Sequence, residues 1–255
     1  QYALAIRDFT SGEPEGYRFG FIGSSDNHQS RPGTGYKEVL RYLNSDSKYS
    51  SKNNFLLSMG PKKEPQLPST KILDLKKFED RISMPRKAGR ISSFLYTGGL
   101  VAAHSKSRNR QALWNSMDSR EVYATSGDRI LLWFDLINHN SGVIQPMGSE
   151  VDLENNPIFR VKAIGAQIQK PGCDLNINAK VSEVISQLCK GECFNPSDLR
   201  KIITSIEIVR IRPQSYSGEP IDPLIEDPWK TFNCEPSQEG CLVEFKDEQF
   251  LGSNR

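Results

Sequence analysis

The chain has 255 residues, enough for one large domain or two smaller ones. Its hydrophobic content of 36% and charged content of 25% are those of a soluble globular protein, and a formal net charge of +2 is too balanced to favour nucleic acid or an anionic membrane surface. No apolar run approaches the roughly 20 residues that span a bilayer, so no membrane span is predicted.

Residues 19–23 form an apolar run with two glycines, which predicts a short buried strand. Asp26 and His28 follow in a loop at its end. Because residues two apart in an extended chain project to the same side, a carboxylate and an imidazole can meet one target there. Such oxygen and nitrogen donors suit Zn, Mn or Fe. The alternative is that Asp26 accepts backbone hydrogen bonds in a turn and His28 is an ordinary loop residue.

The residues after His28 are predicted to form loops and a long surface excursion. Arg31 lies three residues further on, where it either holds an anionic group of a substrate or is simply solvated. Residues 44–69 are polar, contain three prolines and show no periodicity, so we expect an excursion without regular structure. Residues 70–78 are then predicted to form a short helix.

Small apolar residues at 98–103 predict a strand that packs where two backbones approach closely. His104 ends this strand. Two interpretations of His104 stand side by side. It lines the same opening as His28 and contacts a substrate or metal there, or it makes a structural hydrogen bond.

A helix is predicted after Ser107 or Asn109, either of which can cap its first turn. Leu113, Trp114 and Met117 form an apolar stripe on it that we interpret as core packing. Arg120 is expected to face water. Residues 122–129 are predicted to be a tight turn that joins helix to strand, because they contain neither a nucleophile elbow nor a phosphate-binding loop.

Composition changes at Ile130, where branched and aromatic residues become frequent. Strands are predicted at 130–137, 158–168, 202–212 and 241–245, with turn-rich connections that favour an antiparallel sandwich. A helix with apolar residues at helical spacing is predicted at 181–188. We therefore set a domain boundary near Arg129.

All five cysteines lie in the last third of the chain. Cys234 and Cys241 flank a short polar loop that a disulfide closes easily. Cys173 and Cys193 both sit in turns and are the candidates for a second bridge, which leaves Cys189 as a buried thiol. The alternative is that all five are reduced. Two bridges indicate an exported protein, periplasmic or secreted, whereas the spacing gives poor support to a zinc site.

Several stretches resemble known proteins. Residues 23–28 (Gly-Ser-Ser-Asp-Asn-His) resemble the last metal-binding motif of the PHP (polymerase and histidinol phosphatase) superfamily. Residues 98–104 and 120–130, together with 206–214 and 225–230, resemble the DUF3604 family. Its members are PHP-related proteins of largely unassigned function and are similar to the CehA-type carbaryl hydrolases.

The resemblance implies an α/β fold class. Residues 1–129 would be the C-terminal portion of a PHP-like (β/α) barrel, and residues 130–255 an antiparallel β-sandwich-like domain. It also makes Asp26 and His28 metal ligands. The chain departs from the PHP pattern because its three histidines include no His-x-His. We therefore expect the remaining ligands in a part of the same protein that precedes Gln1.

Two functions from different classes follow. The first is a metal-dependent hydrolase that acts on a small-molecule phosphoester, ester or carbamate through metal-activated water, with Arg31 and His104 as substrate-binding residues. The second is a non-catalytic binding or structural module with an incomplete metal site. A second copy of the chain is a further candidate partner, and fold-level similarity alone does not identify the substrate.

Overall fold

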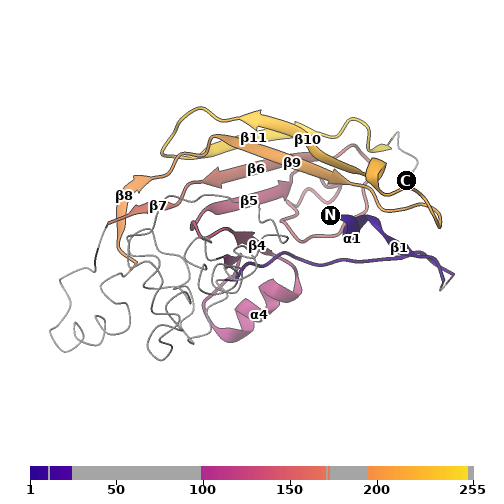
Figure 1. The fold of residues 1–255 in the computed structure, drawn as a ribbon, viewed down its shortest axis with the longest axis horizontal. Coiled ribbons are helices and arrows are strands. Elements are labelled where there is room, and N and C mark those ends of the chain that lie inside the picture. Colours follow the sequence, from indigo (N-terminus) through magenta and orange to yellow (C-terminus); the bar gives the residue numbers. More distant parts are fainter. Residues whose placement is uncertain (11, 25–98, 171, 173–193, 252–255) are drawn as a thin grey trace, which may run out of the picture.

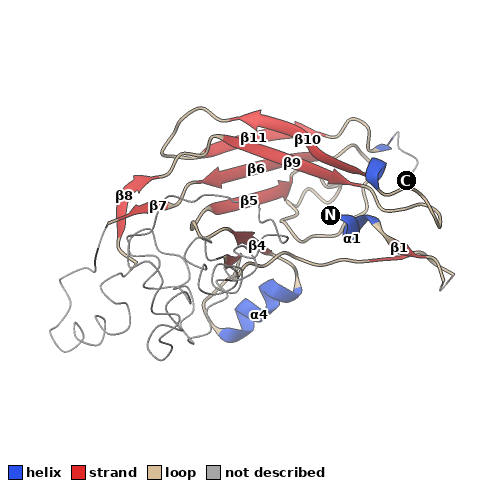
Figure 2. Cartoon of the chain, in the orientation of Figure 1, coloured by secondary structure: helices blue, strands red, loops and turns tan. Residues whose placement is uncertain are grey.

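A computed structural model describes residues 1–10, 12–24, 99–170, 172 and 194–251 of the protein (Figure 1). Short strands dominate this part of the chain (Figure 2). In chain order the elements are α1 (Tyr2–Ala5), β1 (Arg7–Asp8), β2 (Glu15–Gly16), β3 (Leu100–Ala103), α4 (Arg110–Asp118), β4 (Val122–Thr125), β5 (Leu131–Leu136), β6 (Ile158–Ile164), β7 (Gln167–Gln169), β8 (Pro196–Arg200), β9 (Ser205–Ile211), the 3₁₀ turn η3 (Asp222–Leu224), β10 (Ile225–Asn233) and β11 (Cys241–Lys246). None of the described helices is long and apolar enough to cross a membrane.

The largest sheet has three antiparallel strands in the order β11–β6–β5. Its register places Val161 of β6 opposite Phe134 on one side and Val243 on the other. Since side chains alternate between the two faces, one face of this sheet is apolar, and the other carries charged residues such as Arg160, which pairs with Glu244 at 2.7 Å.

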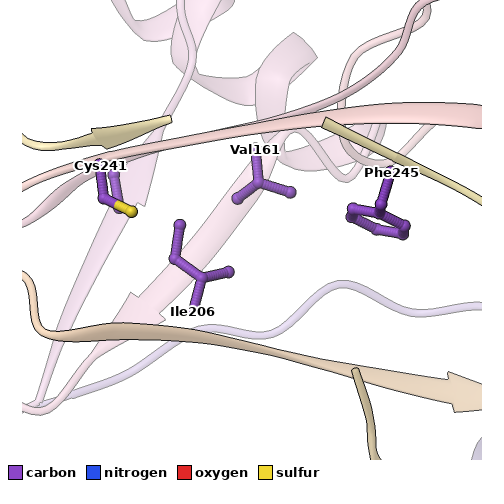
Figure 3. Packing of buried hydrophobic residues seen from close by; sticks show 5 residues of the cluster. Val161, Ile206, Cys241 and Phe245 are labelled. Carbon is purple, nitrogen blue, oxygen red and sulfur yellow. The ribbon is translucent and has the colours of Figure 1, made fainter. Parts of the chain in front are cut away.

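The apolar face packs against a second, two-stranded sheet made by β9 and β10. The two layers share one core, shown in part in Figure 3. Phe245 lies at its centre, with ring centroids of Phe159 and Phe232 both 5.4 Å away. The residues of this core are Leu132, Phe134, Phe159, Val161, Ala163, Ile203, Ile206, Ile208, Trp229, Phe232, Cys234, Cys241, Val243 and Phe245. The predicted β-rich fold is therefore confirmed, and we call these five strands the sandwich.

An ion cluster closes one end of the sandwich. Arg210 lies on β9 and reaches across both sheets, with its guanidinium 2.9 Å from Glu226 of β10 and 2.9 Å from Asp247, which follows β11. The guanidinium also stacks on Trp229 at 4.4 Å from the ring centroid. Because the side chain of Asp247 is only 9% exposed, the Arg210–Asp247 ion pair is shielded from water, and it connects the two layers.

A disulfide joins Cys234, just after β10, to Cys241, the first residue of β11. It confirms the bridge predicted across this loop, and it connects the two sheets covalently at the end opposite the Arg210 cluster. Cys173, Cys189 and Cys193 lie outside the described residues, as do the predicted helices at 70–78 and 181–188.

Residues 19–24, the β3–β4 hairpin and α4 form a second region, which we call the hairpin unit. In Figure 1 it lies below the sandwich. β3 and β4 pair antiparallel, from Leu100 opposite Thr125 to Ala103 opposite Val122. Asn109 caps α4 by accepting a hydrogen bond from Ala112 N at 2.8 Å, as one of the two predicted caps.

The predicted barrel portion is not supported. In residues 1–10, 12–24 and 99–129 the only strand pairs are antiparallel, β1–β2 and β3–β4, whereas a (β/α) barrel is built from parallel strands. The reason lies at the end of α4, where Arg120 has a left-handed φ of 59°. Glu121 N then bonds Ser116 O at 2.9 Å and Arg120 N bonds Met117 O at 3.1 Å. This turn sends the chain back along β3 instead of across to a parallel neighbour.

The N-terminal residues pack against the far end of the chain. Gln214 is 7% exposed, and its backbone N–H donates to Ala5 O at 2.8 Å while its side-chain oxygen accepts from Arg7 N at 3.1 Å. Tyr2 bonds Asp222 in the same region. These contacts cross the boundary predicted near Arg129, which itself stays a prediction.

Candidate functional site

The predicted metal ligands Asp26 and His28, and the predicted substrate residue Arg31, lie outside the described residues. The chain leaves the described part at Ser24 and returns to it at Gly99. These two points are in contact, because a Cβ built on Gly99 would lie 2.7 Å from Ser24 O. Both ends of the intervening stretch, and hence the approach to Asp26, are therefore fixed at one place in the hairpin unit.

The contact at this place is between bare backbones. A Cβ on Gly23 would lie 2.8 Å from Leu100 O and 3.1 Å from Thr125 O, so this glycine lies directly on the β3–β4 hairpin. Side-chain carbons essentially never approach backbone atoms so closely, and glycine is required at both positions. We call Gly23 and Gly99 the glycine clamp. It confirms the close backbone approach predicted from the sequence at 98–103.

The prediction of a buried strand at 19–23 is wrong. Residues 19–24 form no strand, and Phe19, Phe21 and Ile22 are 42%, 54% and 65% exposed. The apolar side chains project outward because the glycines take the inner positions. Gly20 approaches Val122, and Gly23 approaches Leu100. An apolar run held by its glycines is therefore bound to the hairpin without a ladder of hydrogen bonds.

His104 directly follows β3 and is held by three hydrogen bonds. Its Nε2 lies 2.8 Å from Leu132 O, and since a carbonyl only accepts, the proton is on Nε2. Its backbone N–H donates to Glu121 O at 2.9 Å, and its carbonyl accepts from Ser116 Oγ at 2.7 Å. These bonds favour the structural interpretation of this residue.

Tyr123 lies on β4, the strand paired with β3, and its ring centroid is 5.7 Å from that of His104. Its hydroxyl donates to Ile130 O at 2.7 Å and accepts from Leu132 N at 3.2 Å. Burial raises the pKa of the Tyr123 phenol, with a smaller opposing effect of the bond from Leu132 N. Between them, Tyr123 and His104 occupy both backbone groups of Leu132 on the outer edge of β5. These two side chains make the hydrogen bonds that a neighbouring strand would make to β5, and so they attach the hairpin unit to the sandwich.

His104 lies away from the point at which the chain leaves the described residues toward Asp26. Ser24, from which the chain continues to Asp26, lies at the start of β3, whereas His104 lies beyond its other end. At about 3.3 Å per residue the four residues of β3 separate these points by roughly 13 Å.

The apolar stripe of α4 is not core packing. Leu113, Trp114 and Met117 are 40%, 63% and 46% exposed, while Ser116 is the buried residue of this helix. Ser116 faces the hairpin because it donates to His104 O, and this choice turns the larger apolar side chains outward. Arg120 departs from expectation as well, since its guanidinium bonds Gly148 O at 3.3 Å and lies 3.6 Å from Glu150.

Several elements were not predicted from the sequence, and β4 and β10 are the two that matter most for the hairpin unit and the sandwich. The segment at 122–125, predicted as a turn, is strand β4, and the turn begins only after Thr125, where Gly127 has a φ of 120°. Tyr123 was passed over for the same reason. β10 was missed because Pro228 stands inside it, at an irregularity in its pairing with β9.

Among the described residues, no three His, Cys, Asp or Glu side chains lie close enough together to hold a metal ion. A carboxylate and an imidazole spaced as Asp26 and His28 are chemically suitable ligands.

Residues 5–164 match the family described as protein of unknown function DUF3604. The chain belongs to the DUF3604 family. The match begins in α1 and ends at the last residue of β6, so it includes the hairpin unit and two strands of the sandwich, while the β9–β10 sheet of this DUF3604 protein lies beyond it. No curated protein and no solved structure matches the chain.

Proposed function

We propose that this DUF3604 protein is a metal-dependent hydrolase in which Asp26 and His28 bind a divalent ion such as Zn, Mn or Fe. The resemblance of residues 23–28 to the PHP metal-binding motif supports this function. The observation that carries it is the glycine clamp. Gly23 lies against Leu100 of β3 three residues before Asp26, and Gly99 lies against Ser24.

A backbone held this firmly is more useful next to a metal ligand than at the start of an ordinary surface loop. A metal site needs its donors held to within about half an ångström, which requires a supporting structure close to the first ligand. Binding residues commonly lie in loops whose ends are fixed by a packed scaffold. The clamp supplies such a fixed end at the cost of two positions that tolerate no side chain.

When bound, a divalent ion lowers the pKa of its water ligand toward neutrality and polarises a phosphoryl or carbonyl oxygen. The chain's own residues would then have separate tasks. Asp26 and His28 would supply the two ligands, and Arg31 would bind the anionic group of a phosphoester. His104 has its Nε2 proton committed to Leu132 O, so only Nδ1 is left to accept a hydrogen bond from a substrate. An ester or carbamate remains the alternative substrate class.

The disulfide Cys234–Cys241 supports a periplasmic or secreted protein, because such bridges persist in oxidising compartments and are rare in the cytosol. A hydrolase there would meet its substrate outside the cytoplasm.

The test compares Asp26→Ala with Asn27→Ala, a neighbouring substitution that removes no proposed ligand. Each variant is loaded with Zn²⁺ or Mn²⁺, its metal content is measured by elemental analysis, and hydrolysis of p-nitrophenyl phosphate and p-nitrophenyl acetate is followed. We expect Asp26→Ala to lose metal and more than about 100-fold of the activity, since weakening even the support of a ligand costs 10–100-fold. Asn27→Ala should keep both.

Equal metal content and activity in the wild type and Asp26→Ala would refute the hydrolase. The second candidate, a binding or structural module, would then take its place. It is favoured by the exposed apolar face of α4, where Trp114 is 63% exposed, because such surfaces commonly contact other molecules.

A further inference from the structure

The sandwich has outer strand edges that differ in how they are protected. Exposed edges invite pairing with another chain, so proteins usually block them with prolines, bulges, lysines or covering groups. On β5, Tyr123 and His104 occupy the backbone of Leu132, and Gln145 forms a bridge with Leu136. β10 contains Pro228 and an irregular stretch of its register.

In the part of the chain that the structure describes, β9 has none of these features. It runs over Ser205–Ile211 without proline, lysine or a bulge of its own, because the extra residues at the irregularity all belong to β10. No described residue other than those of β10 and its flanking turns hydrogen-bonds to the backbone of β9.

The register shows which backbone groups point outward. Cys234 N donates to Thr204 O and Arg212 N donates to Leu224 O, so the even-numbered residues between 204 and 212 face β10. In an antiparallel pair the alternate residues direct their N–H and C=O away from the partner. Hence Ser205, Glu207, Val209 and Ile211 direct their backbone groups to the outer edge of β9, away from β10.

This edge is complementary to itself. If two copies of β9 pair antiparallel about Ile208, Ser205 faces the partner's Ile211 and Glu207 faces the partner's Val209. All four outward residues of each copy then lie in hydrogen-bonded pairs. No like charges face each other, whereas a register centred on residue 207 would place Glu207 opposite the partner's Glu207, which destabilises the pairing.

The inner face fits the same arrangement. Ile208, half-buried at the margin of the core, would face the partner's Ile208 across the two-fold axis. The core cluster of one sandwich would thus continue into the second. A closed two-fold contact of this kind is the commonest form of homo-oligomer.

We propose that this protein forms a two-fold symmetric dimer through β9, in which two copies pair antiparallel about Ile208 and make a continuous sheet in the order β10–β9–β9–β10. The occupant of the edge is a second copy of the chain. The dimer is independent of the hydrolase, since Asp26 and His28 take no part in it.

The test measures mass by sedimentation over a range of protein concentrations. Val209→Pro removes one N–H from the edge in each copy, so two hydrogen bonds are lost per dimer. At about 1.4 kcal/mol for each tenfold step, we expect the dimer dissociation constant to rise about 100-fold. The matched control is Leu242→Pro on β11, a 60% exposed residue whose backbone likewise faces away from its partner strand. It should leave the dimer intact.

Two further variants test the register, and they remain useful if Val209→Pro fails to fold. Val209→Lys places an ammonium group opposite the partner's Glu207 twice, so the dimer should tighten. The double variant Glu207→Lys with Val209→Lys places lysine opposite lysine and should dissociate. Thermal unfolding of each variant confirms that the fold is retained.

A monomeric wild type at all concentrations would overturn the proposal, as would equal effects of Val209→Pro and Leu242→Pro. Amide hydrogen exchange adds a third outcome. If the protein is monomeric while the amides of Glu207 and Val209 are protected, another segment of the same chain occupies the edge, and the second copy is excluded as its occupant.

Discussion

The sandwich and the hairpin unit of this DUF3604 protein are held together by opposite means. In the sandwich, large side chains from two sheets meet in one core, with Val161 2% and Phe245 7% exposed. In the hairpin unit the closest contacts are those of backbones, where the glycine clamp brings Gly23 against β3 and Gly99 against Ser24. Its large apolar side chains, such as Phe21 and Trp114, are more than half exposed.

This difference shows what each region is built to do. A side-chain core stabilises through the apolar area it removes from water, and it needs no other region to form. A backbone contact removes little apolar area but fixes the position of the chain closely. The hairpin unit therefore contributes placement, at the residues that lead to Asp26, and depends on the sandwich for stability through Tyr123 and His104.

The largest effect is expected from Phe245→Ala. Its ring contacts four other aromatic rings from both sheets, with centroid distances between 5.4 and 6.5 Å. Truncation leaves a cavity in the shared core, and we expect the free energy of unfolding to fall by about 3–5 kcal/mol in chemical denaturation.

The matched control is Phe19→Ala in the hairpin unit, which removes the same ring from a residue that is 42% exposed. Its cost should stay below about 1 kcal/mol. A Phe19→Ala variant as unstable as Phe245→Ala would erase the contrast between the two regions.

The next effect is expected from Gly99→Ala. The added Cβ would lie 2.7 Å from Ser24 O and 2.8 Å from Ser24 N, and backbone atoms move less readily than the end of a side chain. We expect a loss of about 1–3 kcal/mol, in the range of overpacking in a filled interior. Hydrogen exchange should also increase in residues 20–24, whose contact with β3 is disturbed.

Gly16→Ala is the control for this change. A Cβ there would lie 3.6 Å from the Arg7 side chain and 4.0 Å from Ile6 O, which are ordinary contact distances, and the residue has no left-handed φ. If Gly99→Ala proved as harmless as Gly16→Ala, the clamp would not fix the chain, and the hydrolase proposal would lose its structural support.

The sequence predicted the sandwich well, for a physical reason. Strands β5, β6, β9 and β11 bury one face, so their alternation of apolar residues is visible in the sequence. β10 was missed because Pro228 interrupts it. The core could be predicted because burial there depends on the side chains that are present.

The hairpin unit was predicted less well, because its packing depends on side chains that are absent. The apolar residues at 19–23 indicated burial, but the glycines between them take the inner positions. On α4, Ser116 occupies the inner face because His104 O requires a donor, a requirement that appears only once β3 is in place. The pair of glycines at 98–99 was the one sequence signal for this mode of packing.

The smallest effect is expected at the junction of the two regions, from Tyr123→Phe. The substitution keeps the ring but removes the hydroxyl that donates to Ile130 O and accepts from Leu132 N. Because this leaves a partly buried backbone N–H without its partner, we expect a loss of about 1–2 kcal/mol. Tyr216→Phe, at a residue that is 58% exposed, is the control and should be neutral.

The pH dependence of the free energy of unfolding tests the contribution of the Tyr123 hydroxyl to this junction. Burial raises the pKa of Tyr123 in the folded state above that of the unfolded chain. The stability that the protonated phenol contributes is therefore complete below the unfolded pKa, near 10, and is lost as the pH rises through the folded value. The free energy of unfolding of the wild type should fall over this alkaline range, and Tyr123→Phe should remove that part of the fall. If both proteins declined in parallel, the hydroxyl of Tyr123 would not be what binds the hairpin unit to β5, and His104 would carry the junction alone.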